Sequence, residues 1–191
     1  RQRQMCIRDR TRGAQIKASV LDEIVSDKPT NMQYLMLANL QDGIISDELP
    51  YLKGIDSKYE KYCIKNGSLV ISKNASPVKM AIASVQEGNK ILANGNLYVI
   101  ELDEDKINPY FLKAYLESEN GKAALSRVAV GATLLNLPVE GLKKVIIPLP
   151  DLESQKKIAD QYYAKLSEIK ELKYKLEKAT EELEHIYTEE K

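Results

Sequence analysis

The sequence predicts an α+β fold in which a compact mixed domain is followed by one long helix. Three observations predict it. Short apolar runs separated by turn signals fill roughly the first hundred residues, helical spacing begins at Asn108, and a heptad repeat follows Asp151. With 191 residues, 43% of them hydrophobic, the chain can bury one core and carry an appendage. We expect three segments: a leader at 1–12, a domain at 13–150 and a helix at 151–191.

Turn signals divide the first part of the domain into strand-like pieces. Between 15 and 45, the apolar runs IKASVLDEIV and QYLMLANL flank the polar stretch SDKPTN, and Gln41-Asp42-Gly43 predicts a tight turn. The dipeptide Asn66-Gly67 predicts another turn before the strand SLVIS. A polar loop at 73–77 leads to the strand VKMAIASV, and Asn94-Gly95 precedes the strand NLYVIEL.

Helical signals follow these strands. Asn108 is a good N-cap residue and Pro109 suits a first helical turn, with Phe111, Leu112, Tyr115 and Leu116 at helical spacing. A second helical piece, GKAALSRVAV, ends at Gly131, and the run KKVIIPLP predicts a closing strand. The order of strands, helices and strand favours a single α+β domain.

The C-terminal segment reads as one amphipathic helix with Asp151 as its N-cap. Its heptad repeat predicts a helix-pairing seam, which Lys165 interrupts at one expected apolar position. At ~1.5 Å per residue the helix spans about 55 Å, so we expect it to project beyond its domain and to need a partner. The seam residues are Tyr162, Ile169, Leu172, Leu176, Ala179, Leu183 and Ile186.

The first twelve residues differ from the rest in composition. Five of the six arginines lie there, which could indicate a basic nucleic-acid arm, but QMCIRDR also resembles a translated sequencing-adapter artefact. We interpret 1–12 as a non-native leader. From 13 to 150 the chain holds 15 Lys+Arg and 16 Asp+Glu, so any nucleic-acid surface must be a local patch.

Several chemistries lack their residues. The cysteines Cys6 and Cys63 form no C-x-x-C pair and the single histidine is His185, so we expect neither a metal site nor a Ser/His/Asp arrangement. No phosphate-binding loop and no apolar run of membrane-spanning length occurs. We therefore expect a cytoplasmic chain without a cofactor. Lysine or carboxylate nuclease chemistry remains open in principle. The acidic runs 103–105 and 181–182 read as solvated surface.

The most tempting catalytic signal is Asn108-Pro109-Tyr110, which is close to the Asn-Pro-Pro-Tyr type of motif in adenine-N6 methyltransferases. The second proline is missing, and no Gly-rich turn follows a strand to hold a methyl donor. We interpret these residues as a helix start.

The polar loop SKNASPVK is the better candidate for binding, because it offers ammonium groups and an amide to phosphates and base edges. A plain surface loop would have the same composition. We predict a DNA-contacting set from this loop and from the segment GATLLN, in which Gly131 lets the backbone approach closely. The set is Lys73, Asn74, Ser76, Lys79, Gly131, Thr133 and Asn136.

Taken together, the motifs QYLMLANLQDG, NGSLVISKNASPVKMAI, INPYFLKAYLESENGKAAL and GATLLNLPVEGLKKVIIPLPDLESQKKIA resemble the DNA specificity (S) subunit of type I restriction-modification systems. The resemblance covers one target recognition domain and the helix after it. It implies that the domain reads one half of a bipartite site in double-stranded DNA, and that the helix pairs antiparallel with a second recognition half or with another copy. Methyltransferase (M) subunits would then supply methylation and a restriction/motor (R) subunit cleavage, as part of an endonuclease complex for phage defence. The resemblance thus implies that this chain is itself non-catalytic.

Such subunits usually hold two recognition domains and two helices, whereas this chain has one of each. It would therefore be a fragment, a half-subunit or the recognition domain of a fused adenine-N6 DNA methyltransferase. The rival from another class is a coiled-coil protein-interaction scaffold. Neither the bases read nor the partner genes follow from one sequence.

Overall fold

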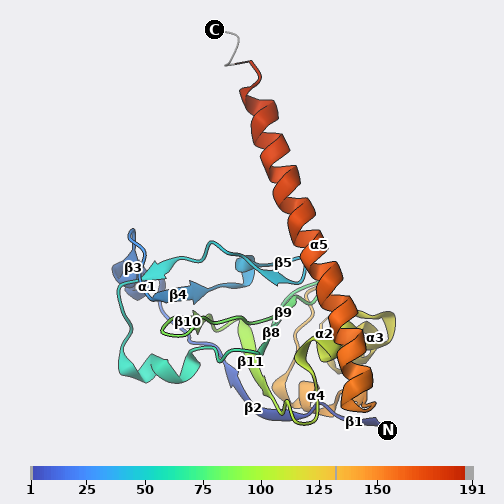
Figure 1. The fold of residues 1–191 in the computed structure, drawn as a ribbon. Helices are drawn as coiled ribbons and strands as arrows, with labels where there is room; N and C mark the ends of the chain where they lie inside the picture. Colours follow the sequence, from blue (N-terminus) through green and yellow to red (C-terminus); the bar gives the residue numbers. More distant parts are fainter. Residues whose placement is uncertain (1, 132, 188–191) are drawn as a thin grey trace.

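In the computed structural model, which describes residues 2–131 and 133–187, two sheets and a group of helices stack on one another and the last helix rises beyond them (Figure 1). The predicted α+β class with a long terminal helix is confirmed. Its core falls into three clusters, one between the helices and the first sheet, one between the two sheets, and one on the far side of the second sheet.

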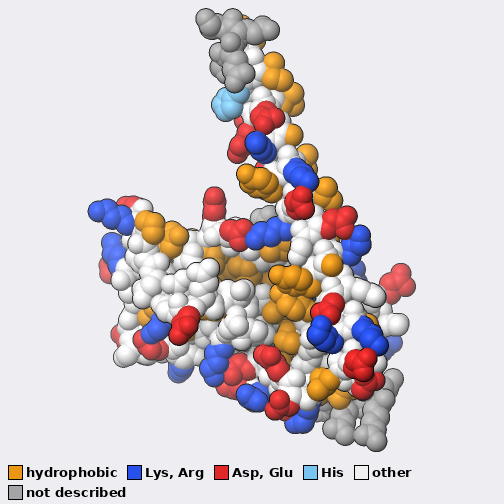
Figure 2. Space-filling view, in the orientation of Figure 1, with side chains coloured by type: hydrophobic (Ala, Val, Ile, Leu, Met, Phe, Trp, Pro, Cys, Tyr) orange, Lys and Arg blue, Asp and Glu red, His pale blue; other side chains and the backbone are white. Residues whose placement is uncertain are grey.

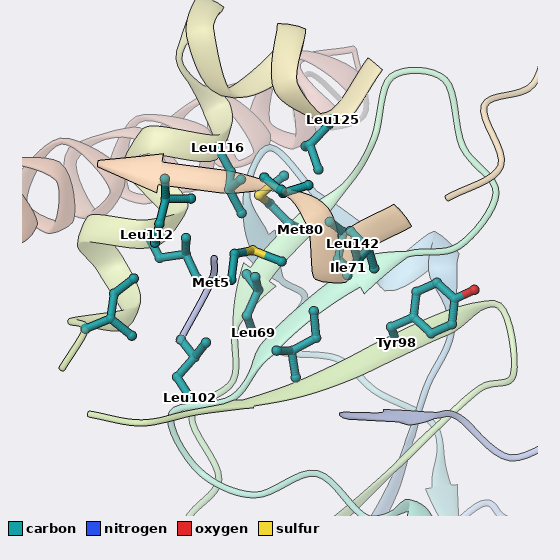
Figure 3. Packing of buried hydrophobic residues seen from close by; sticks show 14 of the residues in the cluster. Met5, Leu69, Ile71, Met80, Tyr98, Leu102, Leu112, Leu116, Leu125 and Leu142 are labelled. Atoms are coloured by element: carbon teal, nitrogen blue, oxygen red, sulfur yellow. The ribbon is translucent and has the colours of Figure 1, made fainter. Parts of the chain in front are cut away.

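The first sheet is antiparallel and has the strand order β2-β11-β8-β9. Its strands are β2 (Ile7–Arg12), β11 (Leu97–Leu102), β8 (Leu69–Ser72) and β9 (Met80–Ile82). Successive side chains of a strand point to opposite faces. Leu69 and Ile71 pack toward the helices (Figure 3). Val70 packs toward the second sheet. Burial on both faces explains why β8 and most of β11 are apolar, whereas the edge strand β2 is mostly polar and more exposed.

The second sheet has the order β10-β4-β7-β3, in which β10 runs parallel to β4 and the other pairs are antiparallel. The strands are β10 (Lys90–Ala93), β4 (Met32–Leu35), β7 (Tyr51–Leu52) and β3 (Val25–Ser26). Beside it, β5 (Leu40–Gln41) and β6 (Ile44–Ile45) form a hairpin whose turn, Asp42 and Gly43, has φ values of 51° and 77°. Positive φ at both central positions is the geometry of a tight hairpin, so the predicted turn is confirmed.

The remaining elements are mostly helical. They are α1 (Ala18–Ile24), the 3₁₀ turns η1 (Leu37–Asn39) and η2 (Ser57–Tyr62), α2 (Pro109–Glu117), α3 (Glu119–Val128), α4 (Val139–Lys144) and α5 (Leu152–His185). A small antiparallel pair joins β1 (Gln2–Gln4) to β12 (Ile146–Pro148) just before α5. Side chains from α2, α3 and α4 meet those of β8 and β11 in the largest core cluster (Figure 3).

The predicted start of α2 is confirmed, because the Asn108 side-chain oxygen accepts hydrogen bonds from the backbone N–H groups of Tyr110 and Phe111. The cap uses the Asn108 side chain for structure, as the helix-start interpretation requires.

Several elements differ from the sequence expectation, among them α1, β10 and α4. The run at 18–24 is the helix α1 and not a strand, since Leu21 and Ile24 are half-buried at a spacing of three residues between exposed polar ones. The strand β10 and the helix α4 were not expected. The former has only four residues, and the latter contains Gly141, a poor helix former, packed against Val128.

The described part of the leader, residues 2–12, lies in the fold. Strand β2 pairs with β11, and Met5 is buried in the largest core cluster. A non-native origin of 1–12 stays a prediction, and we draw no function from this segment.

Among residues 2–131 and 133–187, no helix combines the length and apolarity of a membrane span. The same residues contain no group of three His, Cys, Asp or Glu side chains placed to hold a metal ion.

Candidate nucleic-acid interface

The polar loop that follows β8 is tied by its backbone to the segment at 130–137. Lys73 donates from its backbone N–H to the Asn96 carbonyl at 2.8 Å, and its own carbonyl accepts from the Leu137 N–H at 2.9 Å. The Ala75 N–H donates to the Leu135 carbonyl at 3.2 Å. Two parts of the chain that lie about 60 residues apart in sequence therefore form one surface.

The second segment folds back on itself as a small hairpin-like loop. Asn136 pairs with Val130 through two backbone hydrogen bonds of 2.8 and 2.9 Å, and it also bridges to Asn74. Gly131 has a φ of 114°, and a Cβ built there would lie 2.5 Å from the Leu134 carbonyl oxygen. Only glycine fits this position, although the close approach is to the loop's own backbone.

The predicted DNA-contacting residues occupy different parts of this surface. Lys73 and Asn74 are half-buried beside Asn136, while Ser76 and Thr133 are exposed. Lys79 lies at the other end of the loop, where its backbone pairs with Ser72. There it lines a hollow of about 410 Å³ together with Asp42 and Glu117, which gives it acidic neighbours.

The charges of the loop are uncompensated by direct ion pairs. Within the described residues neither Lys73 nor Lys79 has a carboxylate within 4 Å, whereas Lys65 pairs with Glu101 at 2.9 Å and Lys90 with Glu60 at 2.8 Å. A lysine without an intramolecular partner can give its full charge to a phosphate. Lys73 therefore combines a fixed backbone with an available cation.

Asn136 has a geometry that limits what it can contact. Its side-chain oxygen is buried and, among the described residues, has no hydrogen-bond partner. An oxygen without solvent access cannot accept from a base edge in this conformation. The residue acts here through its backbone, by joining the loop at 73–75 to the one at 130–136.

This surface also carries two exposed apolar side chains that the sequence did not predict as part of it. Val130 is 62% exposed and Leu134 is 56% exposed, and both lie in the loop that Asn136 closes. Apolar side chains beside polar ones are what contact with a thymine methyl group requires. The sequence signal for them was two bulky apolar residues close to Gly131, one just before it and one three residues after it.

The long helix α5 begins with a defined cap and a buried polar side chain. The Ser154 backbone N–H donates to Asp151 at 2.9 Å and holds the pKa of that carboxyl below its usual value. Gln155 is fully buried, and Ala159 one turn later is buried as well. Farther along, Lys170 and Lys173 form ion pairs with Asp47 and Asp42 around the β5–β6 hairpin.

Helix α5 packs on its own domain through one face near its start, and it exposes a different, apolar face farther along. Toward its start the helix packs on its own domain through Gln155, Ala159, Tyr162 and Leu166, spaced four, three and four residues apart. Lys165 lies on the exposed side there and pairs with Glu168, which explains the interruption of the predicted seam. Tyr162 belongs to the intramolecular contact, and its predicted role in helix pairing stays a prediction.

From Ile169 onward the apolar stripe of α5 is exposed (Figure 2). Its large side chains are between 43% and 69% exposed, and Ala179 is exposed as well. The stripe consists of Ile169, Leu172, Leu176, Ala179, Leu183 and Ile186.

Residues 27–182 match the family described as the type I restriction modification DNA specificity domain. The chain belongs to this family. Comparison with curated proteins finds no match in sequence.

Solved structures share the fold of this specificity domain. One comes from work titled as the structural basis of complex assembly and conformational transition of the type I R-M system. It is 19% identical with a TM-score of 0.62, over 96% of this chain and 43% of that one. The HsdS subunit from Thermoanaerobacter tengcongensis is 18% identical with a TM-score of 0.58, over 90% and 39%. The type I S subunit from M. genitalium is 15% identical with a TM-score of 0.53, over 84% and 37%. The chain thus spans about two fifths of these proteins.

Proposed function

We propose that this chain is a non-catalytic DNA specificity subunit, or half of one, that reads one half of a bipartite site. The observation that carries the proposal is the junction of Lys73–Ala75 with Val130–Leu137, which joins an unpaired lysine, exposed hydroxyl groups and exposed apolar side chains in one surface of a family member. Phosphate contacts would supply most of the affinity and base edges the selectivity.

The exposed stripe of α5 would pair antiparallel with the equivalent helix of a second copy or of another recognition half. The residues described here carry one such helix and span about two fifths of the structural relatives, and the proposal places the second helix in another copy or another recognition half. The pair would hold two recognition domains apart and so set the gap between half-sites. Methyltransferase subunits would dock on this assembly to methylate adenine, and a motor subunit would cleave.

The test is a filter-binding titration of the purified chain against a random duplex library at several salt concentrations. A reader of DNA should lose affinity steeply as salt rises and should select a split sequence. In a host that carries the chain with its methyltransferase, methylome mapping should find the same split sequence modified at adenine. No DNA binding at low salt and no modified split site would overturn the proposal.

A coiled-coil scaffold for protein binding is the second candidate, which the exposed stripe favours equally. It predicts self-association through α5 with no affinity for DNA. The titration above separates the two, because both candidates form helix pairs and only one binds duplex.

A further inference from the structure

A closed cycle of polar contacts joins α2 to α5. The Lys113 ammonium donates to Glu117 at 2.7 Å and to the Tyr162 hydroxyl oxygen at 2.5 Å, and the Tyr162 hydroxyl donates to the other Glu117 carboxylate oxygen. The same ammonium lies 4.9 Å from the centre of the Tyr162 ring. Lys113 is fully buried, and Glu117 is 31% exposed.

The β5–β6 hairpin covers this cycle, and Gly43 is the residue that permits it. A Cβ on Gly43 would lie 2.7 Å from the Lys113 nitrogen, 3.4 Å from Glu117 and 3.5 Å from Leu166. The hairpin and the loop after it also reach α5 through the ion pairs of Asp42 with Lys173 and of Asp47 with Lys170. Three elements therefore meet around one buried ammonium group.

The charges of the cycle balance. Burial lowers the pKa of Lys113 while Glu117 opposes this effect, and burial together with Glu117 raises the pKa of Tyr162. With the ordinary charges of its side chains the cluster holds one cation, one anion and one neutral hydroxyl group. Buried polar contacts of this kind add little net stability compared with apolar packing, but they require one relative orientation of the groups that form them.

The orientation of α5 relative to the domain matters because a small tilt near its start displaces its far end by a large distance. From Tyr162 to His185 the helix rises about 35 Å at ~1.5 Å per residue. A tilt of about 10° at Tyr162 would move the far end by roughly 6 Å, close to two base pairs of DNA at ~3.4 Å each. A spacer that sets a gap between half-sites therefore needs a joint with a defined angle.

We propose that Lys113, Glu117 and Tyr162, covered by Gly43, form the joint that fixes the direction of α5 relative to the recognition domain. Its consequence for half-site spacing rests on the proposed function. The three residues are positioning residues, since none of them lies in the segments that Lys73 and Asn136 join; Glu117 alone borders the loop, in the hollow beside Lys79. Apolar packing by Ala159 and Leu166 holds the helix against the domain, and the polar cycle selects its angle.

The angle can be measured directly by pulsed electron spin resonance. Spin labels at Lys53→Cys on the domain and Lys178→Cys on α5, both exposed positions, report the distance across the joint when Cys6 and Cys63 are replaced by serine. An excess of unlabelled chain removes distances between copies. We expect one narrow distance distribution for this reference protein.

Two variants break the cycle, and two matched variants leave it intact. Lys113→Met keeps the length of the side chain and removes the charge, and Tyr162→Phe removes only the hydroxyl group. Their controls are Lys156→Met, which breaks an exposed ion pair with Asp160, and Tyr163→Phe on the adjacent tyrosine. Both cycle variants should at least double the width of the distribution or shift its centre by several ångströms, while both controls should match the reference.

The outcomes decide the proposal. If Lys113→Met does not fold, Tyr162→Phe carries the test, because it keeps the ring and its packing. If the variants that break the cycle fold and their distance distributions match the reference, the proposed joint is overturned, even if thermal stability changes. The same holds if the control variants broaden the distribution equally.

A second measurement connects the joint to DNA. Selection from a random duplex library should return the same half-site bases for Tyr162→Phe as for the unmodified chain, but a range of gaps in place of one. The same single gap would overturn the role in spacing. An unmodified chain that binds no DNA would overturn the proposed function, while the distance measurement would still decide the joint.

Discussion

The side-chain oxygen of Gln155 accepts a hydrogen bond of 2.9 Å from the backbone N–H of Asn108, so the first turn of α5 is tied to the N-cap of α2. The amide nitrogen of Gln155 donates to the carbonyls of Lys106 and Pro150 at 3.1 and 2.9 Å. One buried side chain thus satisfies three backbone groups from two segments.

Replacing this amide should weaken the fold strongly. Gln155→Leu keeps much of the volume but leaves three backbone groups without their partner, and each buried unpaired group costs ~1–3 kcal/mol. With three such groups we expect a loss of about 3 kcal/mol or more in the free energy of unfolding, measured in urea. Gln161→Leu, an exposed glutamine on the same helix, is the control and should change stability by less than about 0.5 kcal/mol. Equal losses in the two variants would contradict this account.

The turn at Gly43 should tolerate alanine poorly for two separable reasons. Gly88 has a similar φ of 83° but open space around a Cβ, whereas a Cβ on Gly43 would crowd Lys113. Gly88→Ala should therefore cost about 1 kcal/mol from backbone strain alone. Gly43→Ala should cost about 1–3 kcal/mol more, from the added crowding. Urea unfolding of both variants gives the comparison, and a Gly43→Ala loss no larger than that of Gly88→Ala would show that the hairpin moves aside freely.

The raised pKa of Tyr162 predicts a loss of stability at high pH. In the unfolded chain tyrosine releases its proton near pH 10, whereas burial and Glu117 hold the proton in the folded protein. The stabilising contribution is therefore fully present below pH 10 and is lost as pH rises above it. Between pH 9.5 and 11, a range that brackets about pH 10, the free energy of unfolding of the unmodified chain should fall more steeply with pH than that of Tyr162→Phe. If the two curves of unfolding free energy against pH ran parallel, Tyr162 would titrate in the folded protein as it does in the unfolded one.

Lys73 should contribute to DNA affinity through charge alone. Lys73→Ala should weaken binding about equally for all sequences and reduce the slope of log affinity against log salt by about 1, as loss of one phosphate contact does. Lys65→Ala removes a lysine that Glu101 already neutralises, so its slope should stay the same. A filter-binding salt series measures both slopes. Reversed behaviour of the two variants would move the DNA surface away from the loop at 73–76.

The free part of α5 should set the gap between half-sites. Inserting one heptad after Lys178, beyond the ion pairs of Lys170 and Lys173, keeps the apolar stripe in phase and lengthens the helix by about 10 Å. The selected gap should grow by about three base pairs at ~3.4 Å each, with the half-site bases unchanged. An unchanged gap would mean that the helix pairs two chains but does not set the distance between half-sites.

Local signals in the sequence were enough to predict much of the fold. The caps at Asn108 and Asp151, the turn at Asp42-Gly43 and the length of α5 each depend on residues a few positions apart. Short-range hydrogen bonding and side-chain periodicity leave a readable pattern for such features. The short elements β10 and α4 lacked that pattern, since four or six residues carry too little periodicity to distinguish strand from helix.

Contacts between distant segments decided the rest. Nothing in the sequence pairs Asn74 with Asn136, because backbone hydrogen bonds between strands carry no side-chain signature. The heptad placed Tyr162 on one seam with Ile169, but burial beside Lys113 turns the start of α5 toward its own domain and leaves only the later part exposed. A heptad repeat shows which side of a helix is apolar. Which part of the protein packs against that side at each position along the helix depends on the packing of the whole domain.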